Sequence, residues 1–185
     1  MSRRGVGVLS LSTTFDILAN IVMSRRTIRE FTSDTVPRDL VEKILDVSRW
    51  APSGGNIQDW RFVVVTDSKL LRAIKMFSPG WIGGGNPVAV VICSDKEWAF
   101  IRGGPLARDV MYLVHVGIVA QTIVLIAHSL GLGTNMIMSF SKDAVKTLLK
   151  LPENWEPVMI ILIGYPAEKP KPPPRLPLSD LIVWR

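Results

Sequence analysis

Apolar and polar residues alternate along the chain in a pattern that predicts short strands mixed with helices. Four apolar stretches have the length of strands and are bounded by turn residues or helical segments: 61–66, 88–93, 135–138 and 158–163. Five stretches carry apolar residues at helical spacing: 15–23, 37–50, 68–77, 110–130 and 142–149. No repeat or linker divides this pattern. We therefore expect one domain over residues 1–185.

The stretch from Val110 to Leu130 is long enough to cross a membrane and contains no Asp, Glu, Lys or Arg. Its polar residues recur at heptad spacing, however, with His115, Thr122 and Ser129 along one line of the helix. Such a polar edge is typical of a helix buried in protein. We expect a central buried helix shared between two subunits, ended by left-handed Gly131 and Gly133. Membrane insertion is the minor alternative.

Both ends of the chain differ from the middle. Residues 1–13 contain a short apolar run without a small-residue cleavage site, so we interpret them as a loose arm rather than a targeting signal. Residues 168–185 are expected to form an extended C-terminal arm, and the prolines of its first part, residues 168–177, predict no helix or strand there.

Composition excludes several classes of protein. With 48% hydrophobic and 21% charged residues, the chain is not disordered. The single cysteine, Cys93, rules out an internal disulfide and fits the cytoplasm. Cys93 lies in an apolar strand, so we interpret it as a structural thiol.

The net charge of +6 raises the question of nucleic-acid binding. The basic residues are scattered, except near Arg25 and in the proline-rich arm, and no nucleic-acid-binding motif is present. A basic surface that attracts dinucleotide phosphates is the simpler interpretation. No metal cluster, catalytic triad or acid–base pair stands out. His115 and His128 lie within the apolar helix and are interpreted as core histidines.

The candidate chemistry lies in an arginine cluster and a turn-rich loop. Arg25, Arg26 and Arg29 offer fixed donors to a phosphate. About two dozen residues later, the loop Ala51-Pro52-Ser53-Gly54-Gly55-Asn56 allows close approach of backbone N–H groups to a flat ligand. Considered alone, the arginines would be interpreted as a basic turn exposed to solvent. Together with the loop they favour a phosphorylated cofactor.

A second glycine-rich segment, Gly83-Gly84-Gly85, lacks the Lys-Ser/Thr that a phosphate-binding P-loop needs and is followed by Pro87. We interpret it as a flexible turn over the core that borders the substrate pocket.

These motifs resemble those of the nitroreductase family of FMN-dependent oxidoreductases. The resemblance rests on residues 25–31, residues 51–60, Gly131-Leu132-Gly133-Thr134 with the following residues 135–140, and Arg175-Leu176-Pro177, all in the family's order. It implies an α+β fold with a mainly antiparallel central sheet flanked by helices and the long helix at a dimer interface. The hydrophobic pattern alone does not choose this fold over a doubly wound sheet.

The resemblance also implies a site for FMN. Arg25, Thr27 and Arg175 would hold the phosphate, with Arg26 adjacent, and Arg29 would lie beside the pyrimidine end of the ring. The remaining residues that it implies are Pro52, Ser53 and Gly54 from the partner subunit, Met138 and Ser139 near the reactive nitrogen, and Asn56. Asn56 either contacts the ring edge or fixes its own loop.

The implied function is an FMN-dependent oxidoreductase that uses NAD(P)H to reduce electron-poor acceptors such as nitroaromatics or quinones by a ping-pong mechanism. FMN carries the chemistry, so no catalytic side chain is expected. We expect a cytoplasmic homodimer. The alternatives are a dehalogenase or flavin-consuming enzyme of the same fold, or a flavin-binding protein without turnover. Two departures from the family pattern are Asp59, in place of proline, and Pro173, in place of a lysine.

Overall fold

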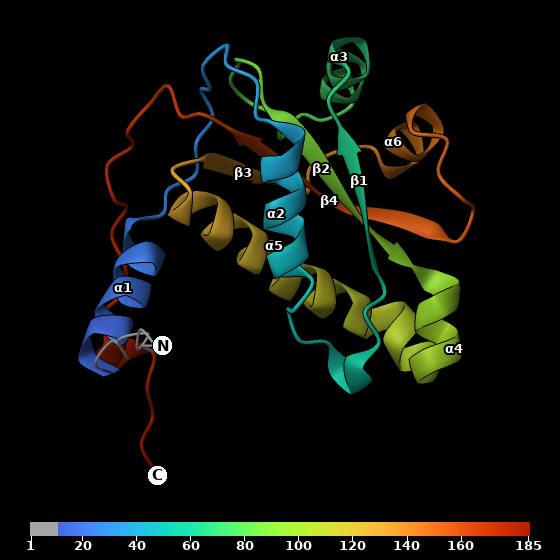
Figure 1. Ribbon diagram of the computed structural model, residues 1–185. Helices are drawn as coiled ribbons and strands as arrows, with labels where there is room; N and C mark the ends of the chain where they lie inside the picture. The colour runs from blue at the N-terminus through green and yellow to red at the C-terminus, as the bar shows by residue number, and fades with distance from the viewer. Residues whose placement is uncertain (1–10) are drawn as a thin grey trace, which may run out of the picture.

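The structure is a computed structural model that describes residues 11–185, and its centre is a four-stranded antiparallel sheet (Figure 1). The strands lie in the order β1-β2-β4-β3, and every neighbouring pair is antiparallel. Their bounds are β1 (Trp60–Val65), β2 (Val88–Asp95), β3 (Gly133–Ile137) and β4 (Trp155–Gly164). This confirms the expected α+β fold and excludes a doubly wound parallel sheet.

The central strands β2 and β4 are apolar on both faces because helices cover both sides of the sheet. β2 is buried over its whole length, and Val90 lies opposite Ile161 of β4. A strand that is buried on both faces reads as a continuous apolar run rather than an alternating one. That is the pattern by which the sequence predicts both strands.

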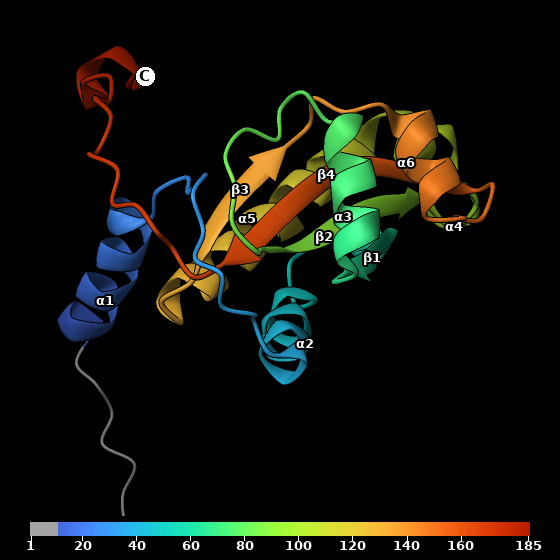
Figure 2. The ribbon, with the colours of Figure 1, turned by 90° about the horizontal axis from the view of Figure 1, so that it is seen from above.

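The described residues contain six α-helices, and four of them form the two layers that cover the sheet. Their bounds are α1 (Leu11–Ser24), α2 (Arg38–Ser48), α3 (Ser68–Met76), α4 (Lys96–Leu106), α5 (Tyr112–Ser129) and α6 (Lys142–Leu148). α2 and α5 lie on one face of the sheet, and α3 and α6 lie on the other (Figures 1 and 2). Each layer has its own core, centred on Ile44 and Ile123 in the first and on Ile74 and Leu162 in the second.

The long helix α5 is a core helix with one uncovered side. Val116, Val119 and Ile123 are buried in the α2/α5 layer, whereas Leu113 and Val114 are exposed. By length and composition, the continuous helical stretch Lys96–Ser129 also qualifies as a membrane span, and 44% of its most apolar part is buried inside the chain. The packing of α5 on the sheet favours the expected core position.

Three local features differ from expectation. The sequence pattern does not predict α4, because Gly103-Gly104-Pro105 reads as a loop; a π-helical turn (Ala107–Met111) joins α4 to α5 beyond these residues. α1 begins at Leu11 instead of residue 15, and the rest of the expected N-terminal arm lies outside the described residues. Gly131 is left-handed as expected, with φ 80°, but Gly133 instead belongs to β3.

The first helix and the C-terminal arm both extend from the β3 side of the molecule, away from the sheet (Figures 1 and 2). Residues 168–177 form no helix or strand, as the prolines predict, and a short 3-10 turn (Leu178–Asp180) follows. Phe15, Met23 and Trp184 are more than two-thirds exposed. The two extensions therefore present apolar side chains that the rest of this chain does not cover.

Candidate functional site

The chain leaves α1 directly into the arginine cluster. Thr27 forms an isolated parallel bridge with Thr134, and the N–H of Ile28 donates to the carbonyl of Thr134 at 2.9 Å. The side chain of Ile28 is buried in the α3/α6 core. This extended segment anchors the arginines to the edge of β3, on a rigid part of the sheet.

The C-terminal arm returns to the same place and is fixed there by Glu168. The Glu168 carboxylate accepts hydrogen bonds from the backbone N–H groups of Arg29 and Glu30, and the N–H of Ala167 donates to the carbonyl of Glu30. The two N–H groups, Arg29 first, hold the pKa of Glu168 below its usual value. One carboxylate thus holds the start of the arm beside the arginine segment.

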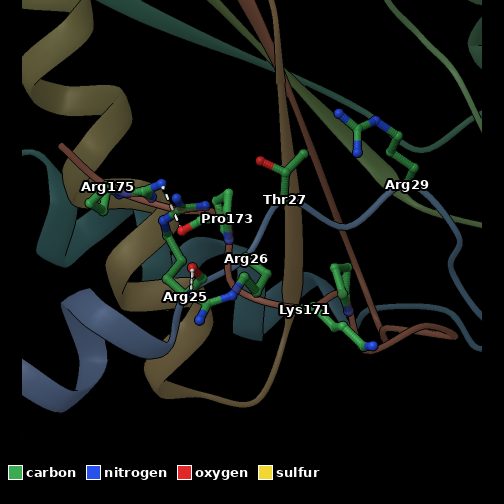
Figure 3. Close-up of a pocket in the computed structure, with 8 residues that line it drawn as sticks. Arg25, Arg26, Thr27, Arg29, Lys171, Pro173 and Arg175 are labelled. Atoms are coloured by element: carbon green, nitrogen blue, oxygen red, sulfur yellow. Dashed lines mark hydrogen bonds between the residues drawn. The ribbon is translucent and has the colours of Figure 1, made fainter.

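Between the two segments lies a cavity of about 330 Å³ (Figure 3). Its lining contains no carboxylate and consists of Arg25, Arg26, Thr27, Arg29, Pro170, Lys171, Pro173 and Arg175. Burial, and then the positive charges of Arg26 and Arg175, lower the pKa of Arg25. The cations that line this cavity repel one another, so a bound anion would be favoured there.

Not every cation in this cavity is free to bind a ligand. The Arg26 guanidinium donates to the carbonyls of Met23 at 2.7 Å and Arg25 at 2.8 Å, which closes the end of α1. Lys171 lines the cavity although the motifs did not single it out. It lies two residues before Pro173, where the family pattern has its lysine, and its place in the basic arm is the signal that could have found it.

The turn-rich loop has a strained backbone held by its own side chains. Gly55, Asn56 and Gln58 all have left-handed φ angles, between 52° and 59°. The N–H of Gln58 donates to the Ser53 hydroxyl at 3.0 Å, and the Gln58 amide donates to Oδ1 of Asn56 at 2.9 Å. The Asn56 side chain thus helps to fix the loop, and its contact with the ring edge stays a prediction. Backbone strain of this kind persists only where the surroundings hold it in place.

The loop borders a second cavity, of about 380 Å³, against α5. The cavity is almost wholly apolar and is lined by Pro52, Ser53, Gly54, Met111, Val114, His115 and Ile118. At its edge, the N–H of Gly54 donates to Nε2 of His115 at 3.0 Å. His115 is 2% exposed and fully hydrogen-bonded, as expected of a core histidine.

Met138 and Ser139 follow β3, and Met138 is 63% exposed. The carbonyl of Ser139 accepts a hydrogen bond from the N–H of Gly80 at 3.0 Å. The segment is thus tied to the turn that precedes the triglycine. Neither residue lines either of the two cavities.

The triglycine segment is packed on the arginine segment rather than free over the core. Gly83 and Gly85 have φ angles of 92° and 91°. A Cβ at Gly83 would lie 2.1 Å from the carbonyl oxygen of Arg29, and a Cβ at Gly85 would lie 2.1 Å from that of Phe31. Only glycine permits this approach. The turn is therefore seated on residues 29–31 and does not lie free over the core, and its expected flexibility stays a prediction.

The arginine segment and the turn-rich loop lie toward opposite ends of α5, where each is hydrogen-bonded to, or adjoins a residue bonded to, a histidine of this helix. His115, near its start, contacts Gly54 of the loop, whereas His128, near its end, shares a 2.8 Å hydrogen bond with Ser24, next to Arg25. These thirteen residues of helix correspond to about 20 Å. No cavity described for residues 11–185 is lined by both groups of predicted residues.

Both the sequence and the fold of this chain are similar to those of known proteins. The model of the nitroreductase family matches residues 22–165. A protein of Methanothermobacter thermautotrophicus, provisionally named NADH dehydrogenase/NAD(P)H nitroreductase, is 32% identical over 154 residues, which are 80% of this chain and 77% of the relative. An FMN reductase [NAD(P)H] of Bacillus subtilis is 30% identical, over 82% of this chain and 67% of the relative. Among solved structures, the NADPH:FMN oxidoreductase of Vibrio harveyi complexed with NAD⁺ has a TM-score of 0.81 and 26% identity, covering 90% and 76% of the two chains.

Proposed function

The chain belongs to the nitroreductase family, and from this premise we propose that it is an FMN-dependent enzyme that oxidises NAD(P)H. The FMN reductase of B. subtilis and the NADPH:FMN oxidoreductase of V. harveyi support flavin and nicotinamide as its reagents. The finer assignments below are our own.

The cation-lined cavity is the observation that carries the proposal. A flavin mononucleotide ends in a phosphate dianion, and the cavity offers Arg25, Lys171 and Arg175 with the hydroxyl of Thr27 and no competing carboxylate. Such a group of cations is costly to gather without an anion to neutralise it. The residues present therefore fit the phosphate end of FMN, with Arg25 as its central partner.

The ring end of the site uses the segments next to this cavity. Arg29 would lie beside the pyrimidine, where its guanidinium stabilises negative charge on the ring, and the backbone N–H groups of Met138 and Ser139 would face the reactive nitrogen. The apolar lining beside Pro52, Ser53 and Gly54 would cover the flat ring and exclude water. When bound, FMN supplies the hydride chemistry, and these residues hold and orient it.

A second copy of the chain would complete the site. The phosphate cavity and the loop lie toward opposite ends of α5, about 20 Å apart along the helix, which favours a loop supplied by a partner chain. A partner packed on the exposed side of α5, near Leu113, would bring its own loop to the first chain's arginines. The apolar surfaces of α1 and the C-terminal arm would be buried in the same homodimer. An exposed apolar surface of this kind is typical of an interface.

We propose that electron-poor small molecules, such as nitroaromatics or quinones, take the electrons in a ping-pong cycle in the cytoplasm. Donor and acceptor would use the same ring face in turn, which requires only that the protein position each of them. The single buried thiol, Cys93, suits a reducing compartment.

The absorbance spectrum of the purified protein tests this function. We expect the bands of oxidised flavin, their loss on anaerobic addition of NADH or NADPH, and their return on addition of a nitroaromatic or quinone. A protein that neither carries nor takes up FMN would contradict the proposal. Flavin that is bound but not bleached by either nicotinamide would favour the non-catalytic binding protein instead.

A further inference from the structure

Asp59 is a buried carboxylate that the proposed function does not use. Its exposed fraction is 0%, and it lies just before β1, where the family pattern has a proline. The hydroxyl of Ser94 donates to its Oδ2 at 2.7 Å, and Nδ1 of His115 lies 2.6 Å from its Oδ1. A carboxylate is buried at high cost unless donors surround it. The buried Asp59 carboxylate therefore depends on two partners, the hydroxyl of Ser94 and the ring of His115.

The hydrogen bonds around His115 settle which ring nitrogen carries the proton. A backbone N–H can only donate, so Nε2 of His115 must accept from Gly54. The proton is then on Nδ1, which donates to Asp59. The carboxylate thus selects the tautomer that leaves an acceptor facing the loop, as carboxylates do for the imidazoles they orient.

The contact with His115 lies where the loop meets α5. A Cβ at residue 54 would lie 2.1 Å from the methyl group of Met111, so the backbone of Gly54 sits directly on the helix. The next turn of the loop contains the left-handed residues Gly55, Asn56 and Gln58. The bond from Gly54 to His115 fixes the loop to α5 just before this strained turn.

We propose that Asp59 and His115 are positioning residues that hold the Pro52–Gly54 backbone in place to receive FMN. The inference rests on the FMN binding proposed above and deepens it. The pair is bonded to the loop at the N–H of Gly54, and through this bond it would act on cofactor binding.

The first test is made on the wild-type protein without FMN. Nitrogen-15 NMR of the histidine rings reports which nitrogen is protonated, and amide hydrogen exchange reports the protection of the Gly54 N–H. We expect Nδ1–H with an unprotonated Nε2, and a slowly exchanging Gly54. A protonated Nε2, or a Gly54 amide that exchanges like an open loop, overturns the proposal.

The second test compares FMN affinity in three variants by titration of the apoprotein, followed by flavin fluorescence. His115→Leu removes the acceptor, and we expect about tenfold weaker binding with faster exchange at Gly54. His115→Gln keeps an acceptor near the Nε2 position and should recover most of both. Thr122→Val removes another polar group of α5, bonded to the carbonyl of Ile118, and should bind FMN like the wild type.

A purely structural role would lower the stability of His115→Leu and leave the affinity of its folded fraction unchanged, which would overturn the proposal. If His115→Leu does not fold, His115→Gln and the wild-type NMR experiment decide. A wild-type protein that binds no FMN contradicts the proposed function, whereas the wrong tautomer contradicts only the positioning role. The two failures are therefore distinguishable.

Discussion

The guanidinium of Arg25 lies between the charges of Arg26 and Arg175, and its lowered pKa reflects burial beside those charges. Arg26 is engaged by backbone carbonyls at the end of α1. Arg25 therefore differs from its neighbour in what it offers to a ligand, although the two are adjacent and alike in sequence. A charge-assisted bond from a partly buried arginine to a phosphate is among the stronger polar contacts that a protein makes.

Arg25→Ala should weaken FMN binding by about 10- to 100-fold while leaving the fold intact, because the cavity loses its central phosphate partner. Titration of the apoprotein with FMN measures the affinity, and circular dichroism checks the fold. Arg72→Ala, an exposed arginine of α3, makes the same change in net charge away from the cavity and is the matched control. A folded Arg25→Ala protein that retains a full complement of flavin would contradict the phosphate site.

The C-terminal arm holds Lys171 and Arg175 at the cavity, and Glu168 fixes the start of this arm to the arginine segment. Glu168→Ala should release the arm, misplace Arg175 and Lys171, and weaken FMN binding, with little change in overall stability.

The pKa of Glu168 is lowered, so its anchoring contribution is present above its ordinary pKa and is lost as the pH falls through the lowered value. FMN affinity of the wild type should therefore fall on acidification, and that of Glu168→Ala should fall less. An equal acid dependence in both proteins would contradict the anchor.

The triglycine segment makes a sharper prediction, because two adjacent glycines differ in their surroundings. Gly83→Ala forces a left-handed alanine against the carbonyl of Arg29 and should cost about 1–3 kcal/mol of unfolding free energy. At Gly84, an added Cβ would meet only a carboxylate oxygen of Glu30, at 3.5 Å. Gly84→Ala is therefore the control and should stay near the wild type. Urea unfolding of the two variants measures the difference, and equal stabilities would refute the proposed seating of the turn.

The fold could be predicted from the sequence, as could the cavity shared by the arginine segment and Arg175, because apolar runs, arginines and glycines carry their chemistry in their type and spacing. The pairing of Asp59 with His115 could not, since the two are 56 residues apart and meet only through the register of β1 and the rotation of α5. The pattern does not predict α4 because Gly103-Gly104-Pro105 reads as a loop. The helical path is kinked there, at Gly104, whose φ of 65° and ψ of −160° are non-helical and accessible essentially to glycine alone.

In the whole molecule, α5 connects the two parts of the proposed site, because one end of it is bonded beside the arginine segment and the other end to the loop. Under the proposed function, a helix that separates the arginines from the loop by about 20 Å would leave each single chain with an incomplete flavin site. The same helix exposes apolar side chains where a partner would pack. Cofactor binding and dimerisation should therefore be lost together, which distinguishes this arrangement from a monomeric flavin-binding domain.

Leu113→Glu tests this coupling, because it places a charge on the exposed side of α5, where Leu113 is 46% exposed in the single chain. We expect the wild type to sediment as a dimer, and the variant to shift to monomer and lose most of its FMN affinity, since a carboxylate is costly to bury in an apolar interface. Met76→Glu, on the far side of the sheet and 82% exposed, is the control and should remain a flavin-loaded dimer. Analytical ultracentrifugation with detection at a flavin wavelength reads both properties at once. A Leu113→Glu monomer that still carries FMN would refute a site shared between two chains, because the arginines and the loop would then meet without the partner.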